Sequence, residues 1–171
     1  LIQLNWLWVA NNEILDISPL AGLTNLTALG LGNNQITSIT PLAALVSLDF
    51  LDVRYNQISD ISVLSGLTDL VTLIVGANQI TDISTLSGLV KLESLHLWEN
   101  QIADISPLAG LTDLTELRAG HNAIQDITPL AGLTNLNFLD LLYNQITNVT
   151  PLSGLVKLTL LHLVFNEITS I

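Results

Sequence analysis

Residues 23–36 read LTNLTALGLGNNQI, and the chain repeats this pattern every 22 residues. Numbering each unit from residue 1 gives seven full repeats and an eighth that stops at its position 17. Positions 1, 4 and 7 are Leu in all eight repeats, position 12 is always Asn and position 14 is always Ile. Such a fixed period indicates one small structural unit per repeat, stacked on its neighbours. We therefore expect residues 1–171 to form a single repeat domain without caps.

Positions 6 to 10 of each repeat predict a strand. In residues 28–32, Ala-Leu-Gly-Leu-Gly, apolar leucines alternate with other residues, which is the period of a strand with one buried face. Positions 7 and 9 should point inward, and positions 6, 8 and 10 should lie on an open face. Because a full turn of chain separates successive copies, the strands must run parallel.

The rest of the unit predicts two turns. The Asn at position 12, turned inward, should satisfy backbone groups of its own turn and the next one. Positions 18 to 22 read Ser-Pro-Leu-Ala-Gly or a close variant. This wording predicts a short 3₁₀ helix with Ser or Thr as its N-cap, Pro at its first position and a Gly of positive φ at its exit. Ala44 replaces that Gly once, so its turn should be strained or differently shaped.

Position 16 carries a column of carboxylates. They are Asp16, Asp60, Asp82, Asp104 and Asp126, with Ser or Asn in the other repeats. Stacked carboxylates attract hard cations, which makes a cation site one interpretation. Asp also closes turns through hydrogen bonds to its own backbone, and we favour this second interpretation.

Composition excludes several classes of function. The formal net charge of -11 argues against nucleic acid and anionic membrane surfaces, and it favours a basic partner. The absence of Cys excludes disulfides and thiolate metal sites. No apolar run is long enough to span a bilayer, so we expect no membrane insertion. Neither a targeting segment nor a Met is present, which suggests a piece of a longer chain.

The rare residue types gather at positions 6, 8, 10 and 11. These positions hold all three Trp, all three Phe, both Tyr, both Arg and all three His. Enrichment in Trp, Tyr and Arg is typical of the hot spots of protein interfaces. We predict a protein partner on the open face, bound through Trp6, Trp8, Phe50, Asp52, Arg54, Tyr55, Ile74, His96, Trp98, Glu99, Arg118, His121, Phe138, Asp140, Tyr143, His162 and Phe165.

The energetic centre of this surface should lie in repeats 3 to 6. Nearer the start of the chain, Gly30 and Gly32 separate the Trp6 and Trp8 pair from Phe50 and Arg54, which suggests a shallow depression for a partner side chain. Two other interpretations stay open. The aromatics could only support the sheet through cross-strand pairs, or they could stack on sugars.

Catalysis is not expected. His96 or His162 would need a fixed partner and a cavity to act as a base or a metal ligand, and a flat open sheet offers neither. Position 8 holds no Ser or Cys beside either His. Asp140, between Arg118 and His162 at this position, predicts a cross-strand charge ladder. We predict a non-enzymatic protein without a metal or a cofactor.

The framework Leu23, Leu26, Leu29, Leu31, Asn34 and Ile36 resembles the leucine-rich repeat. The continuation Asp60-Ile61-Ser62-x-Leu64 and the 22-residue length resemble the bacterial internalin-like class. The resemblance implies a right-handed α/β solenoid, with a parallel sheet on its concave face and short 3₁₀ turns on its convex face.

Internalins use the concave face to grip a host surface protein, so the resemblance implies an adhesion role outside the cell or on a bacterial surface. That family usually carries a helical N-terminal cap and an Ig-like domain after the repeats, and this chain shows neither. Its ends are therefore candidates for self-association. An engineered or recombined binder on the same scaffold remains the alternative origin.

Overall fold

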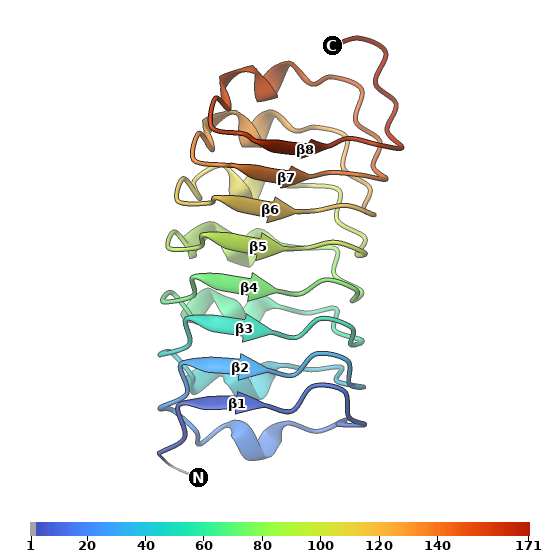
Figure 1. Ribbon diagram of the computed structural model, residues 1–171. Helices are drawn as coiled ribbons and strands as arrows, with labels where there is room; N and C mark the ends of the chain where they lie inside the picture. Colours follow the sequence, from blue (N-terminus) through green and yellow to red (C-terminus); the bar gives the residue numbers. More distant parts are fainter. Residues whose placement is uncertain (1–2) are drawn as a thin grey trace.

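The computed structural model describes residues 3–171, which form one parallel sheet of eight strands in sequence order (Figure 1). Cα partners in neighbouring strands lie one repeat apart, as in Leu29 opposite Leu51. The predicted parallel sheet is therefore confirmed. The strands are β1 (Trp6–Trp8), β2 (Ala28–Gly30), β3 (Phe50–Asp52), β4 (Thr72–Ile74), β5 (Ser94–His96), β6 (Glu116–Arg118), β7 (Phe138–Asp140) and β8 (Leu160–His162).

Each strand ends at position 8, two residues earlier than the alternation predicts. The interstrand hydrogen bonds continue beyond that point: Leu31 N donates to Asp52 O at 2.7 Å and Asn33 N donates to Arg54 O at 2.8 Å. Position 11 then turns the chain. All eight residues there have φ between 51° and 58°, and none of them is Gly. A side chain in this left-handed region costs roughly 1–2 kcal/mol, so this turn must be stabilised by the contacts around it.

Short 3₁₀ helices cover the side of the coil opposite the sheet (Figure 1). Each begins at position 18, with the Ile or Val of position 17 before it and no side-chain cap from that residue. They are η1 (Ser18–Leu20), η2 (Thr40–Ala44), η3 (Ser62–Gly66), η4 (Ser84–Gly88), η5 (Ser106–Leu108), η6 (Thr128–Gly132) and η7 (Thr150–Gly154).

Three predictions about these helices are wrong. No glycine among residues 3–171 has a positive φ, and the helix exit is closed by an ordinary backbone hydrogen bond such as Leu45 N to Leu42 O at 2.9 Å. For the same reason Ala44 fits without a change of shape, and η2 has the same length as η6. The N-cap residue is at position 17, one residue earlier than predicted, and its apolar side chain makes no cap. The side chain of position 16 accepts from the backbone N of position 18 instead, as Asp16 Oδ1 does from Ser18 N at 2.8 Å.

The core is a stack of apolar side chains that repeats with the chain. In the inner repeats these residues are fully buried, for example Leu51, Leu73, Leu95 and Leu117 at 0% exposure. Burial of one such Leu contributes about 2 kcal/mol. Exposure rises at the far end, where Leu161 keeps 40% of its surface. Leu1, the first framework leucine, lies outside the described residues.

The Asn of position 12 forms the predicted ladder. In repeat 2, the Asn34 amide donates to Leu31 O at 2.8 Å and to Val9 O at 3.1 Å, while its Oδ1 accepts from Ile14 N at 3.0 Å. The Asn side chain therefore binds the backbone of the preceding repeat, not that of the following one as predicted. Within residues 3–171 no buried side-chain N or O atom lacks a hydrogen-bond partner.

Replacing Asn144, which is 7% exposed, with Ala should lower the free energy of unfolding by about 3 kcal/mol. The reason is that Ala119 O, Leu141 O and Ile124 N would lose their amide partner in the interior. Chemical denaturation measures the change. Gln101→Ala, at an exposed position of the framework, is the control and should leave stability nearly unchanged. Equal losses in both variants would contradict the ladder's role.

The carboxylates of position 16 close local turns, as the favoured interpretation holds. Ser106 N donates to Asp104 Oδ1 at 2.8 Å, and Ser106 Oγ donates to Oδ2 at 3.0 Å. The backbone bond, followed by the hydroxyl bond, holds the pKa of Asp104 below its usual value. Ser and Asn make the same backbone bond in other repeats, as in Thr150 N to Asn148 Oδ1 at 2.9 Å. No group of three His, Asp or Glu residues among residues 3–171 is arranged to hold a metal ion.

Asp104→Ala should lower the melting temperature at neutral pH more than Asp104→Asn, because Asn keeps the Oδ1 acceptor. The carboxylate stabilises the fold only when ionised, since its pKa is lower in the folded state. Its advantage over Asn should therefore be present above pH 3.8, the ordinary value for Asp, and disappear as pH falls through the lowered folded value. Thermal unfolding of both variants between neutral and strongly acidic pH measures this. An advantage that grows on acidification would show the opposite linkage.

Candidate functional site

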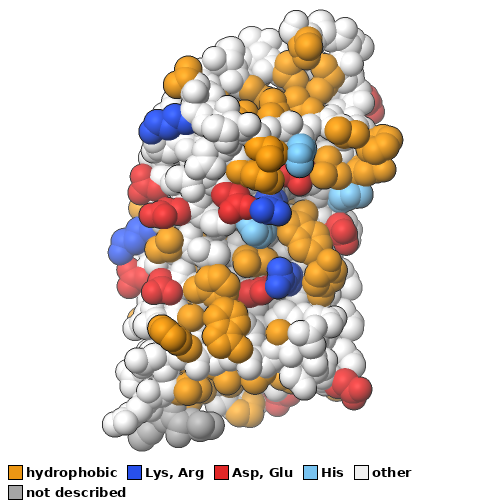
Figure 2. Space-filling model, in the orientation of Figure 1, with side chains coloured by type: hydrophobic (Ala, Val, Ile, Leu, Met, Phe, Trp, Pro, Cys, Tyr) orange, Lys and Arg blue, Asp and Glu red, His pale blue; other side chains and the backbone are white. Residues whose placement is uncertain are grey.

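The open face consists of the residues at positions 6, 8, 10 and 11 of each repeat, on the side of the sheet that the 3₁₀ helices leave uncovered. Figure 2 shows apolar side chains over both ends of this face, with Arg, His and acidic side chains between them. Positions 6 and 8 belong to the strands, whose pleat directs both side chains outward. Positions 10 and 11 follow directly, where the chain turns away from the sheet.

Trp8 and Phe50 meet above repeat 2. Their ring centroids are 5.2 Å apart, although a whole strand separates β1 from β3. The contact is possible because repeat 2 presents Ala28 and Gly30 between them, and a Cβ on Gly30 would overlap the Trp8 ring. Trp8 therefore fills the space above Gly30. The predicted depression is therefore filled at Gly30.

Tyr55 and Trp98 repeat this arrangement above repeat 4. Their centroids are 5.1 Å apart in an edge-to-face pair, and the repeat between them presents Gly76 and Ala77. A Cβ on Gly76 would collide with the Trp98 indole. Small residues at the open face thus leave the space into which aromatic rings from neighbouring repeats pack.

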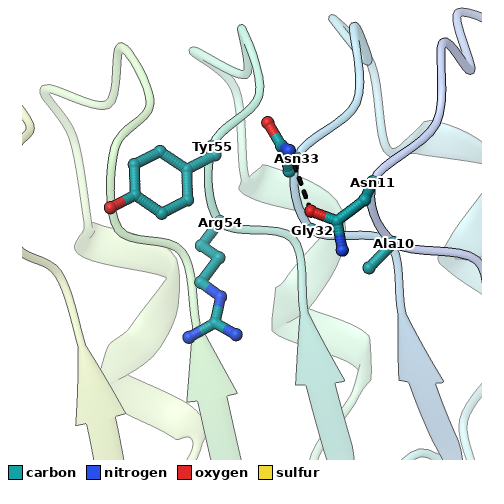
Figure 3. Close-up of a pocket in the computed structure, with 6 residues that line it drawn as sticks. All are labelled: Ala10, Asn11, Gly32, Asn33, Arg54 and Tyr55. Carbon is teal, nitrogen blue, oxygen red and sulfur yellow. Dashed lines mark hydrogen bonds between the residues drawn. The ribbon is translucent and has the colours of Figure 1, made fainter.

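A hollow remains beside Gly32, where a depression was predicted. It has a volume of about 310 Å³ and lies between Arg54 and Tyr55 on one side and Ala10 and Asn11 on the other (Figure 3). Asn33 completes its lining, and its Nδ2 donates to Asn11 Oδ1 at 2.9 Å.

Glu116 organises the polar centre of the face, and the sequence prediction missed it. Its carboxylate accepts from Arg118 Nε at 2.6 Å and from Ser94 Oγ at 3.1 Å, and it lies 3.3 Å from His96 Nε2. Partial burial acts to raise the pKa of Glu116, but the Arg118 and His96 contacts lower it overall. Burial lowers the pKa of His96, with Glu116 opposing the shift. The alternation of Glu116 and Arg118 along one strand was the signal that could have identified this pair.

This cluster lacks the geometry of a hydrolytic triad. In such a triad the acid and the nucleophile bind opposite nitrogens of the imidazole, so that the acid orients the ring while its other nitrogen takes the proton of the nucleophile. Here Ser94 and Glu116 both lie 3.3 Å from the same Nε2 of His96. The Ser94 hydroxyl instead donates to the Glu116 carboxylate, which also accepts from Arg118.

The charge ladder at position 8 is only half formed. His162 Nδ1 lies 3.9 Å from Asp140 Oδ1, as predicted. Arg118 turns instead to Glu116 on its own strand, and its guanidinium lies 4.6 Å from the centre of the Phe138 ring. The long Arg side chain thus gains an ion pair and a cation–π contact together.

Two predicted contact residues are almost covered. Asp52 is 6% exposed and Ile74 is 8% exposed, so they offer little surface to a partner. Burial raises the pKa of Asp52, opposed by the Arg54 backbone bond and charge. Asp52 Oδ2 lies 3.3 Å from Arg54 Nε, which makes it a support for Arg54.

At the far end, position 11 carries an aromatic stack. The His121 and Tyr143 rings lie 4.3 Å apart, and the Tyr143 and Phe165 rings lie 4.2 Å apart, both nearly parallel. Phe138 packs edge-on against His162 at 6.0 Å. The remaining predicted residues, Trp6 and Glu99, are exposed on the same face.

A parallel sheet of one-repeat strands, closed by 3₁₀ turns and an Asn ladder, defines the leucine-rich repeat class. The family model for leucine-rich repeats, in units of two copies, matches residues 2–44, 46–88, 90–132 and 113–154. The chain therefore belongs to the leucine-rich repeat family, as the sequence indicated. Proteins of this family commonly mediate protein–protein interaction, and the fold is a typical non-enzymatic scaffold for it.

Within that class, two of the most similar solved structures are internalins, and the chain is internalin-like. Internalin F of Listeria monocytogenes is 42% identical over 99% of this chain, with a TM-score of 0.97. Internalin C2 of the same species is 40% identical over 98%, with a TM-score of 0.96. A leucine-rich repeat protein of Leptospira interrogans is 27% identical over 97%, with a TM-score of 0.90. The chain spans 50%, 74% and 44% of these three structures, and no curated protein sequence matches it.

Gly76→Ala should force the Trp98 indole away from the sheet and break its contact with Tyr55, at a cost of about 1 kcal/mol. The ring-proton shifts of Tyr55 in an NMR spectrum measure the contact directly. Gly66→Ala is the matched control, because a Cβ there meets nothing within 4 Å. Unchanged Tyr55 shifts in the Gly76 variant would contradict the packing of the Trp98 indole against Gly76.

Proposed function

We propose that the open face binds a protein partner, with its energetic centre at Arg54, Tyr55 and Trp98. The observation that carries the proposal is the distribution of side chains. A framework that hardly changes presents different residues at each step of one face, and six of the eight repeats carry aromatic or cationic side chains there. Trp6, at 68% exposure, and Tyr55, at 50%, are unusual on a surface that nothing covers.

The seventeen predicted residues divide into contacts and supports under this proposal. The exposed aromatic rings and Arg54 would touch the partner. Asp52 and Ile74 would hold the contact residues from below. His96, Glu116 and Arg118 form a satisfied polar patch between the two aromatic ends, which suits the directional hydrogen bonds of a protein interface.

A sugar ligand is less well matched. Sugars stack on open aromatic faces, whereas His121, Tyr143 and Phe165 stack face to face on one another. Trp98 and Trp8 likewise lie against glycine backbone and a neighbouring ring. The exposed edges and the remaining outer faces suit apolar side chains of a protein.

The likeness to internalins supports a role in surface recognition or adhesion outside the cell, which we include in the proposal. None of the helices among residues 3–171 is long and apolar enough to cross a membrane. We also propose that the eight repeats act as one domain. Self-association through the end repeats remains a prediction, for which the hollow of about 630 Å³ beside Leu161 and Leu163 offers a surface.

Tyr55→Ala combined with Trp98→Ala should reduce capture of a partner from a cell-surface protein extract at least tenfold, since central aromatic anchors each contribute about 2 kcal/mol or more. Quantitative mass spectrometry of proteins retained by the immobilised chain measures the loss. The control is Val46→Ala combined with Val90→Ala. It removes two apolar side chains that are 52% and 55% exposed away from the open face. A partner retained equally by both variants would place the binding surface elsewhere.

A further inference from the structure

The hollow beside Gly32 is lined by hydrogen-bond donors. Asn33 Nδ2 is used by Asn11 Oδ1, which leaves the Asn11 amide nitrogen directed away from that bond (Figure 3). The terminal nitrogens of Arg54 have no partner among residues 3–171, whereas the Tyr55 hydroxyl points away from the hollow (Figure 3). Because Gly32 adds no side chain and Ala10 adds only a methyl group, an incoming group can approach these donors closely.

Asp52 fixes the orientation of Arg54. Its Oδ1 accepts from the Arg54 backbone N at 3.1 Å, and its Oδ2 lies 3.3 Å from Nε. Both contacts engage the inner part of Arg54, so the two terminal nitrogens stay available as a fork. A guanidinium that is held in this way loses less side-chain entropy when it binds a second acceptor.

The two charges of this pair differ in accessibility. The Arg54 side chain is 48% exposed, whereas the Asp52 side chain is 8% exposed. No other charged residue occupies an open-face position in repeats 1 to 4. A ligand that approaches this half of the face therefore meets one accessible charge, and it is positive, although the chain as a whole carries a formal net charge of -11.

We propose that this hollow binds a carboxylate of the protein partner, held by the two terminal nitrogens of Arg54 with the Asn11 amide as a further donor. The inference rests on the proposed protein-binding function and specifies one contact of it. The carboxylate belongs to an Asp or Glu side chain or to a chain terminus, two sources with the same chemistry. Bidentate pairing with Arg is the geometry that carboxylates favour. A neutral amide of the same shape would leave part of the fork unpaired.

Blocked amino acids test the seat without a known partner. The whole chain is titrated with N-acetyl-glutamic acid amide, N-acetyl-glutamine and N-acetyl-glutamine amide, while NMR follows the backbone amides of Gly32 and Asn33. The first probe carries only a side-chain carboxylate, the second only a terminal carboxylate, and the third carries none. We expect saturable shifts with the first probe, the second or both, and at least tenfold weaker binding of the third. The pattern of the first two identifies the source of the carboxylate.

Two variants locate the effect. Arg54→Gln should weaken binding of the carboxylate probes about tenfold. Gly32→Val should block it by filling the hollow and by pressing on the Arg54 side chain, since a Cβ there lies 3.3 Å from Arg54 Cγ. Lys91→Gln removes the same charge from a surface ion pair with Asp69 and should leave binding unchanged. Equal shifts with all three probes, no saturable shift at these amides, or an unchanged affinity in Arg54→Gln would each overturn the proposal. If only the carboxylate proposal is wrong, the probes will not bind but the Tyr55 and Trp98 variant will still lose the partner in the capture experiment. Failure of this proposal is therefore distinguishable from failure of the proposed function.

Discussion

The side-chain amide of position 12 is the interaction on which the rest of the structure depends. Each strand is only three residues long, and the chain then turns sharply through a left-handed residue. That turn would bury unpaired backbone groups on both sides. The Asn amide supplies two donors and an acceptor within one side chain, and so it pairs the turn with the turn before it. Because every repeat solves the same problem in the same way, the framework tolerates nearly any side chain on the open face.

The framework could be predicted from the sequence because each of its rules is local. The alternation at positions 6 to 10 predicts the strand, the invariant Asn predicts the ladder, and the Ser-Pro pair predicts the 3₁₀ helix. A single copy of these patterns would be ambiguous, but eight copies in register are not. The errors were local too. Position 22 seemed to require a positive φ because Gly often ends helices in that conformation, yet the left-handed residue lies at position 11, where Tyr55 and Phe165 gave no sign of it.

The candidate site was predictable as a set of positions but not as a set of contacts. Register places Glu116 next to Ser94 and Arg118 next to Asp140, yet it does not say that Arg118 will choose Glu116. The side-chain rotamer decides that choice. In the rotamer that pairs with Glu116, the Arg118 guanidinium also lies over the Phe138 ring. Likewise, the burial of Asp52 depends on what its neighbours cover, which the pattern of one repeat does not contain.

Strand spacing explains how aromatic rings and glycines combine on the open face. Neighbouring parallel strands lie about 4.8 Å apart, which matches the distance between stacked rings. Rings in adjacent repeats therefore stack directly, as Tyr143 and Phe165 do at 4.2 Å. Rings two repeats apart start about 10 Å apart and meet only by leaning over the strand between them. Trp8 and Trp98 can lean because the repeat between each pair of rings presents a glycine, Gly30 or Gly76, so these glycines shape the open face by leaving room for the neighbouring rings.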